Sequence, residues 1–118
     1  MAETVDWAWF AGLFEGEGCI LFTNKNSVRL AISSTDHDVL SRAQAIAGGS
    51  VTGPYEPRGM GHKVQWEWRL NRTELIQEVL AQIEPYMGER RLARINEATD
   101  RLAQCRRRKL YKRRRSGL

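Results

Sequence analysis

The chain has 118 residues, of which 42% are apolar and 28% are charged, and this length is typical of one domain with a single hydrophobic core. No stretch reaches the ~18 consecutive apolar residues that a membrane-spanning helix needs. The acidic first residues also lack the charged-then-apolar pattern of a secretory signal. We therefore expect an intracellular protein of the cytoplasm or nucleoid, which is not secreted and makes no membrane contact.

The formal net charge of +5 is divided unevenly along the chain. Residues 105–118 contain eight of the 19 basic residues and no acidic residue, so this segment carries +8. The other 11 basic residues stand against all 14 acidic residues within residues 1–104, which leaves a net charge of −3. The division predicts a domain over residues 1–104 and a basic C-terminal tail over residues 105–118. Such a tail is typical of a segment that grips nucleic-acid phosphates, and a disordered solubilising end is the alternative.

The cysteines and histidines do not have the spacing of a metal site. Cys19 and Cys105 are far apart and form no C-x-x-C pair, and neither His37 nor His62 lies at ligand spacing from a cysteine. We expect free thiols, as in a reducing compartment, and solvated histidines.

The first expected elements are a helix and a strand hairpin. Residues 6–15 are mostly apolar, Asp6 is a plausible N-cap, and Gly16 and Gly18 are expected to end the helix. A short apolar run over residues 19–23 and an alternating run over residues 28–33 then predict two strands, because turn-forming residues separate them.

A second helix is expected to begin near residue 34. Thr35, followed three residues later by Asp38, resembles a capping box, and the pair Gly48–Gly49 is expected to end the helix. Helical spacing of apolar residues between these points favours the same assignment.

Two strands and two helices are expected in the rest of the chain, with strands over residues 50–55 and 64–70 and helices after Asn71 and from Tyr86 to about Gln104. The order predicts an α+β fold, αββαββα, with a four-stranded antiparallel sheet packed on helices, plus a C-terminal helix and the basic tail.

Alternation in the strands predicts a sheet with two different faces. The inward set is apolar: Ile20, Phe22, Leu30, Ile32, Val51, Trp66 and Trp68. The outward set mixes hydrogen-bonding groups and charges of both signs: Leu21, Thr23, Lys25, Arg29, Ala31, Ser33, Gln65, Glu67 and Arg69. Such a face suits the reading of base edges in a DNA groove. An ordinary solvated sheet face is the alternative.

The first helix has two features that a plain core helix does not need. Ala8, Gly12 and Gly16 are four residues apart, so they form one stripe along which a second helix can approach closely. Glu15 and Glu17 place two carboxylates at the helix C-terminus, where they oppose the macrodipole. A bound cation such as Mg²⁺ or Ca²⁺ would compensate them, because these ions prefer oxygen ligands.

The segment Phe10–Gly18, with the sequence FAGLFEGEG, resembles the LAGLIDADG motif position for position. Phe replaces Leu and Ile, Glu replaces both Asp residues, and Gly replaces the second Ala. The resemblance extends from about Trp7 to Leu102, because the element order is also that of the LAGLIDADG homing endonucleases. It implies that fold, and a chain with a single motif implies a homodimer.

The resemblance also implies roles for individual residues. Glu17 falls on the essential metal carboxylate, Gly16 offers its backbone carbonyl to the metal, and Mg²⁺ is the implied cofactor, with no small-molecule cofactor. Glu15 has a more structural role near the interface. The dimer interface is expected to contain Ala8, Ala11, Gly12, Glu15 and Gly16.

Two further active-site residues are implied by position. Arg90 follows a proline–aromatic pair at the spacing of the family's basic residue, so we expect it to stabilise developing charge. Thr35 (or Asp36) stands where a polar residue orders active-site water, although Thr35 is also a plausible N-cap.

The expected contacts with double-stranded DNA are the outward sheet residues together with Thr52, Lys63 and four residues of the tail, Arg106, Arg107, Arg108 and Lys109.

The implied function is that of an intron- or intein-associated homing endonuclease, which cleaves both strands of a long pseudo-palindromic DNA site. Glutamate at the metal position departs from the motif: the longer carboxylate can still bind Mg²⁺, but with a different geometry. The alternatives are an inactive DNA-binding regulator, an RNA-binding intron maturase, or an unrelated basic RNA-binding domain.

Overall fold

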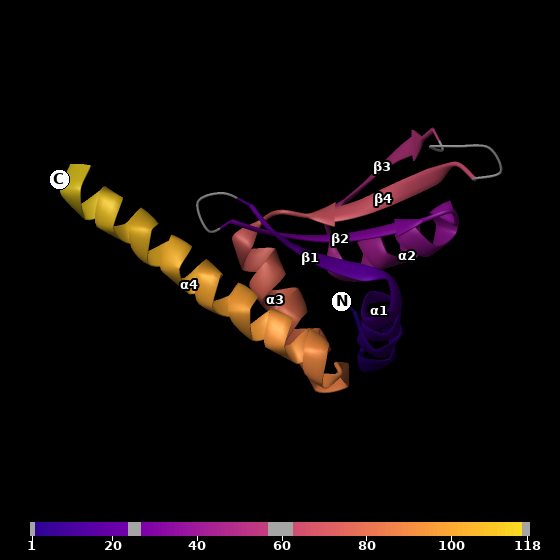
Figure 1. Ribbon diagram of the computed structural model, residues 1–118, viewed down its shortest axis with the longest axis horizontal. Coiled ribbons are helices and arrows are strands. Elements are labelled where there is room, and N and C mark those ends of the chain that lie inside the picture. Colours follow the sequence, from indigo (N-terminus) through magenta and orange to yellow (C-terminus); the bar gives the residue numbers. More distant parts are fainter. Residues whose placement is uncertain (1, 24–26, 57–62, 117–118) are drawn as a thin grey trace.

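The computed structural model describes residues 2–23, 27–56 and 63–116, with side chains through Gln104, and contains one antiparallel sheet of four strands in the order β1-β2-β4-β3 (Figure 1). The elements in chain order are α1 (Thr4–Glu17), β1 (Gly18–Phe22), β2 (Val28–Ser34), α2 (His37–Ala47), β3 (Ser50–Tyr55), β4 (Gln65–Leu70), α3 (Thr73–Ile83), the 3₁₀ turn η2 (Glu84–Tyr86) and α4 (Glu89–Ser116). This arrangement confirms the predicted α+β fold.

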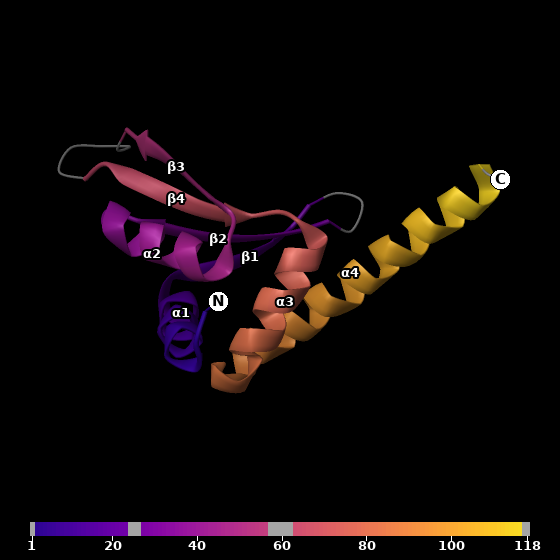
Figure 2. The ribbon, with the colours of Figure 1, turned by 180° about the vertical axis from the view of Figure 1, so that it is seen from behind.

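The helices α1, α2 and α3 cover one face of the sheet and leave the other face open (Figures 1 and 2). α4 lies beside α3, runs past the edge strand β1, and projects beyond the sheet toward the C-terminus. No helix in the part of the chain that the structure describes is both long and apolar enough to span a membrane.

The strand register explains why the covered face is apolar. In an antiparallel sheet, directly paired residues point to the same side. Ile20 pairs with Leu30, and Ile32 pairs with Trp68, so their side chains enter the core together. Trp68 is fully buried, meets the ring of Phe10 edge-to-face at 5.4 Å, and donates its Nε1–H to the carbonyl of Gly48 at 2.8 Å. The predicted division of the strands into two faces is confirmed.

The helix starts differ from the sequence expectations. α1 begins at Thr4, and the carboxylate of Asp6 accepts a hydrogen bond from the backbone N–H of Glu3 at 3.0 Å, so Asp6 lies in the first turn and is not the N-cap. The Thr35 capping box is also wrong, because Asp36 is the N-cap of α2. There the hydroxyl of Ser34 accepts the N–H of Asp36 at 3.0 Å and turns the chain before the helix begins.

The last helix is longer than predicted. α4 begins at Glu89, after η2, and continues to Ser116 instead of ending near Gln104. The reason is visible in the sequence: residues 105–116 contain no glycine or proline, and arginine and lysine are good helix formers. Residues 105–116 are therefore a continuation of α4.

Candidate active site and nucleic-acid interface

The motif ends in an abrupt change from helix to strand. α1 ends at Glu17 and β1 begins at Gly18, whose N–H donates to the carbonyl of Phe14. A Cβ at Gly18 would lie 2.5 Å from that carbonyl oxygen, so only glycine fits this turn. The turn leaves Glu17 exposed at the junction of the two elements.

The two carboxylates of the motif have different surroundings. Glu15 Oε1 accepts the N–H of Gly88 at 3.4 Å, at the start of α4, where the helix dipole favours a negative charge. The Glu17 side chain has no hydrogen bond or ion pair to any residue that the structure describes. Glu15 therefore joins α1 to α4, and Glu17 is available to a ligand.

The oxygen atoms at this junction fit a hard divalent cation. Glu17 contributes a free carboxylate, and Gly16 lies in the last helical turn, whose carbonyls lack intrahelical partners. No group of three or more His, Cys, Asp or Glu residues that could hold a metal ion occurs among the described residues. Mg²⁺ is commonly held by one or two carboxylates with waters and substrate phosphates, so the donor set matches that ion.

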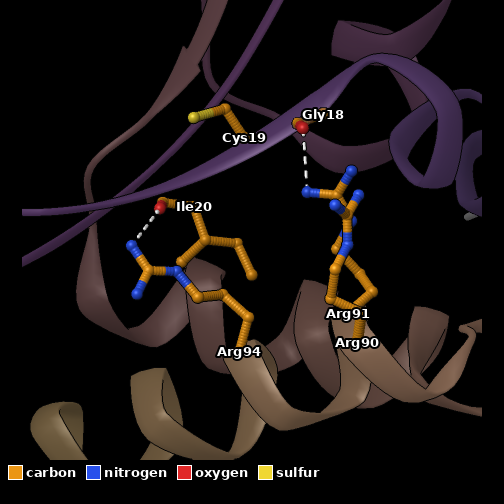
Figure 3. A pocket seen from close by; sticks show the side chains of 6 residues that line it. All are labelled: Gly18, Cys19, Ile20, Arg90, Arg91 and Arg94. Carbon is orange, nitrogen blue, oxygen red and sulfur yellow. Dashed lines mark hydrogen bonds between the residues drawn. The ribbon is translucent and has the colours of Figure 1, made fainter.

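Arg90 lies close to this junction. An open pocket of about 280 Å³ separates β1 from the start of α4 and is lined by Gly18, Cys19, Ile20, Arg90, Arg91 and Arg94 (Figure 3). Arg90 is exposed and has no partner among the described residues, so its guanidinium is free to meet an anion. The fold thus brings Arg90 into one pocket with Gly18, the residue that follows Glu17.

The other arginines of this pocket were not foreseen from the sequence. Arg91 donates to the carbonyl of Gly18 at 2.9 Å, and Arg94 donates to the carbonyl of Ile20 at 3.2 Å (Figure 3). Because β1 is an edge strand, these carbonyls have no neighbouring strand to bond, and α4 supplies the donors.

The next part of α4 holds the end of the same strand. The guanidinium groups of Arg94 and Arg101 both contact the Phe22 ring, at 3.9 and 4.1 Å from its centroid. Glu97 forms ion pairs with both arginines, each at 3.4 Å. The helical spacing of Arg94, Glu97 and Arg101 in the sequence could have predicted the two ion pairs. The contact of these arginines with β1 could not be predicted in this way, because it depends on the fold.

Thr35 lies at the same end of the sheet as the motif. Gly18 pairs with Ile32, so the residues that follow β2 lie at the end of the sheet where β1 begins. Thr35 is exposed and has no side-chain partner among the described residues.

One side of α1 is open. Val5, Ala8, Gly12 and Gly16 are exposed, and Val5 is 66% accessible. A Cβ added at Gly12 or Gly16 would meet nothing within 4 Å. Ala11 is fully buried in the core, so the expectation that it lines a dimer interface is wrong: its side chain packs inside its own protomer.

The outer face of the sheet brings together the predicted outward residues. Leu21 pairs with Arg29, Ala31 with Arg69, and Ser33 and Thr52 both with Glu67. Ala31 is only 6% exposed, so it belongs to this face by register but offers little contact surface. The exposed members outside these pairs are Thr23, Lys63 and Gln65. Lys25 lies outside the described residues, as do the side chains of Arg106, Arg107, Arg108 and Lys109.

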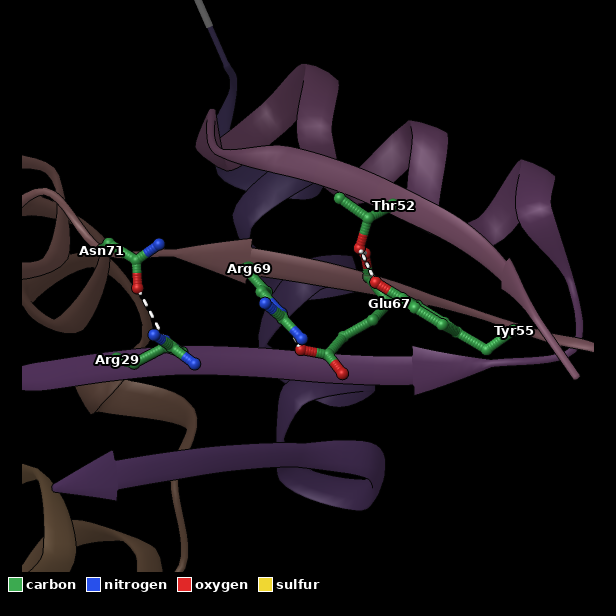
Figure 4. Close-up of polar contacts among 6 residues, drawn as sticks. All are labelled: Arg29, Thr52, Tyr55, Glu67, Arg69 and Asn71. Carbon is green, nitrogen blue, oxygen red and sulfur yellow. Dashed lines mark hydrogen bonds and ion pairs between the residues drawn. The ribbon is translucent and has the colours of Figure 1, made fainter. Parts of the chain in front are cut away.

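Several polar side chains on this face are paired with each other (Figure 4). Arg69 forms an ion pair with Glu67, and this hydrogen bond and charge raise the pKa of the Arg69 guanidinium. Arg29 Nε donates to Asn71 Oδ1 at 2.8 Å, and the hydroxyls of Thr52 and Tyr55 are 2.7 Å apart. These contacts hold the donors and acceptors of the face in fixed positions before any ligand binds.

Comparison with known proteins identifies the fold. No protein-family model and no curated protein matches the chain. Among solved structures, the homing endonuclease I-CvuI in complex with its target matches 87% of this chain and 67% of its own, with a TM-score of 0.58 and 22% identity. The group I intron-encoded homing endonuclease I-CeuI, complexed with DNA, matches 87% of this chain and 56% of its own, with a TM-score of 0.68 and 13% identity.

A third homing endonuclease, I-TnaI, gives a TM-score of 0.65 at 18% identity, over 86% of this chain and 74% of its own. The chain therefore has the fold of the LAGLIDADG homing endonucleases.

Proposed function

We propose that this chain is a metal-dependent, sequence-specific endonuclease that cleaves both strands of a long pseudo-palindromic DNA site as a homodimer. The observation that carries the proposal is Glu17, a carboxylate without a protein partner among the described residues at the end of the motif helix, beside a pocket that contains Arg90. The fold supports it, because the structural neighbours are homing endonucleases and two of them were solved with DNA.

Glu17 and the carbonyl of Gly16 are the residues that would hold Mg²⁺. A bound divalent ion supplies an activated water and neutralises charge on the scissile phosphate. I-CvuI complexes were determined in the presence of Ca and of Mg, which supports the choice of a divalent cation. No small-molecule cofactor is part of the proposal.

Arg90 and Thr35 complete the proposed site. The free guanidinium of Arg90 would donate hydrogen bonds to the phosphate as negative charge develops on it. The exposed hydroxyl of Thr35, at the same end of the sheet, would orient a water molecule through a hydrogen bond.

The open side of α1 is the proposed dimer interface. Ala8, Gly12 and Gly16 lack bulk, so the α1 helix of a second protomer can approach closely, with Glu15 at the end of the contact. A two-fold axis along this stripe would bring two copies of Glu17 together, one for each DNA strand. The two strands would then be cleaved by symmetry-related sites.

The outer face of the sheet is the proposed base-reading surface, and the basic end of α4 is the proposed phosphate grip. In this assignment residues 1–104 are the endonuclease domain and residues 105–118 act through charge. Side chains such as Arg69 and Gln65 offer donors and acceptors to base edges. The eight basic residues after Gln104 would contact phosphates without regard to sequence.

Cleavage of a randomised DNA library in Mg²⁺ tests the proposal. Wild-type protein is expected to cleave a defined site, and Glu17→Gln is expected to bind that site but cleave at least ~100-fold more slowly, because it removes the metal carboxylate. Glu74→Gln is the matched control, since Glu74 is exposed on α3, where its carboxylate is 3.8 Å from Arg72. Wild-type protein that binds a site and never nicks it would instead be a DNA-binding regulator, and selective binding of intron RNA would indicate a maturase.

A further inference from the structure

Two adjacent arginines at the start of α4 have different surroundings. Arg90 is exposed and unpaired among the described residues, whereas Arg91 is half-buried and donates two hydrogen bonds. Arg91 Nη1 donates to the carbonyl of Gly18 at 2.9 Å, and Nη2 donates to the carbonyl of Glu15 at 3.0 Å. These two carbonyls flank Gly16 and Glu17, so a single guanidinium bridges the residues on either side of the metal-ligating pair.

The end of α1 needs such a partner. The last turn of the helix contains no basic residue, and its final carbonyls lack intrahelical partners. Arg91 provides the positive charge that favours a helix C-terminus together with two donors in a planar fork. Its guanidinium carbon also lies 5.4 Å from the centroid of the Phe14 ring.

Glu17 has no contact of its own that would fix its position. Its side chain forms no hydrogen bond or ion pair with the described residues, so the carboxylate is placed only by the backbone that carries it. That backbone is held at Glu15 and Gly18 by Arg91, and at the Glu15 side chain by the N–H of Gly88.

We propose that Arg91 is a positioning residue for metal binding, which sets the place of Glu17 by clamping the junction between α1 and β1. This inference rests on the proposed endonuclease function. Arg91 does not contact the phosphate in this scheme, because its guanidinium already bridges two backbone carbonyls. The contact with the phosphate belongs to Arg90.

The first test needs neither metal nor DNA. The N–H of Gly18 donates to Phe14, so its hydrogen-exchange rate reports how firmly the junction is held. Arg91→Gln is expected to speed this exchange about tenfold, the size of effect for charged hydrogen bonds. Arg90→Gln, the matched control on the neighbouring position, is expected to leave it unchanged.

The second test compares the metal dependence of cleavage. Arg91→Gln is expected to raise the Mg²⁺ concentration at half-maximal rate about tenfold, and to leave DNA affinity without divalent metal within about twofold. Arg90→Gln is expected to lower the rate at saturating Mg²⁺ without moving that midpoint. The Mg²⁺ midpoint of Arg91→Lys is expected to lie between those of wild type and Arg91→Gln, because an ammonium lacks the planar fork of donors. Arg91→Lys is used in place of Arg91→Gln if the latter does not fold.

The outcomes separate this inference from the proposed function. An unchanged Gly18 exchange rate in both Arg91 variants overturns the clamp. A faster exchange with an unchanged Mg²⁺ midpoint overturns the link to metal binding and leaves Arg91 a purely structural residue. Wild-type protein that neither binds nor cleaves DNA overturns the proposed function, and the metal-binding role of Arg91 with it.

Discussion

The backbone N–H of Gly88 donates a hydrogen bond to the Glu15 carboxylate across 3.4 Å, and this contact joins residues that are 73 positions apart in the chain. This contact distinguishes the two carboxylates of the motif. Glu15 contributes to the association of α1 with α4, and Glu17, two residues later, has no such contact among the described residues. We therefore expect Glu15 to contribute to stability and Glu17 to contribute to activity.

Glu15→Gln is expected to lower the free energy of unfolding by about 0.5–1 kcal/mol, because a neutral amide loses the interaction with the α4 dipole at an exposed site. Glu17→Gln is expected to leave it unchanged within about 0.5 kcal/mol, since this side chain bonds to none of the described residues of its own protomer. Urea unfolding of both variants at low protein concentration measures the difference. Equal decreases in the free energy of unfolding of the two variants would contradict the different roles of Glu15 and Glu17.

A side chain at Gly12 is compatible with the fold of one protomer but not with the proposed dimer. A side chain there meets nothing within 4 Å in one protomer, so Gly12→Arg is expected to fold normally and to gain helix propensity. The same side chain would separate two α1 helices that pack closely. Analytical ultracentrifugation is expected to show a dimer for wild type and a monomer for the variant.

Ala45→Arg provides the control for Gly12→Arg, because Ala45 is also exposed and helical but lies on α2. This variant is expected to remain dimeric. A wild-type chain that stays monomeric in the presence of its DNA would refute the interface on α1.

Arg69 is expected to read a base on the outer face, where Glu67 holds its guanidinium. Arg69→Gln is expected to lose about 1–3 kcal/mol of discrimination at one base pair in each half-site, since a homodimer repeats the contact. Selection of cleaved sites from a randomised library measures this loss. Arg72→Gln, at the N-terminus of α3 and exposed, is expected to keep the wild-type preference.

Glu67→Gln tests the same pair from the other side. It removes a negative charge from the DNA-facing surface and frees Arg69, so it is expected to raise DNA affinity and to steepen the dependence on salt. Unchanged affinity in Glu67→Gln together with unchanged preference in Arg69→Gln would show that this face does not contact DNA.

Local patterns in the sequence were sufficient to predict the four strands and their two faces, but not the order β1-β2-β4-β3. Alternation from Val28 to Ile32 and from Val64 to Leu70 predicted the two faces, and turn residues predicted the hairpins, because both depend on neighbours in the chain. The motif predicted the end of α1 to within two residues: the helix was expected to end at residue 15, and it ends at Glu17, where Gly18 is required because a Cβ would collide with Phe14.

Contacts between distant segments were not predictable in the same way. The hydrogen bonds from Arg91 and Arg94 reach carbonyls 73 and 74 residues away, and a run of arginines on a helix gives no sign of such partners. The burial of Ala11 was missed because α1 is apolar on most of its circumference, so spacing alone did not tell its core side from its open side.

The basic end of α4 gives the final prediction. Because α4 is one helix to Ser116, residues 106–115 are carried on a continuation of the element that grips β1 through Arg94 and Arg101. Deletion of residues 106–118 removes all eight basic residues after Gln104. It is expected to weaken DNA binding and to flatten the plot of log affinity against log salt by about 0.9 for each phosphate that the protein no longer neutralises.

The cleaved sequence is expected to stay the same after this deletion, because phosphate contacts position a protein on DNA without reading bases. Binding measured between about 50 and 200 mM salt, with site selection on the same two proteins, separates the two effects. A truncated protein with a new site preference would show that the end of α4 reads bases. An unchanged salt slope would show instead that the segment does not reach the DNA, and its charge would then act only on solubility.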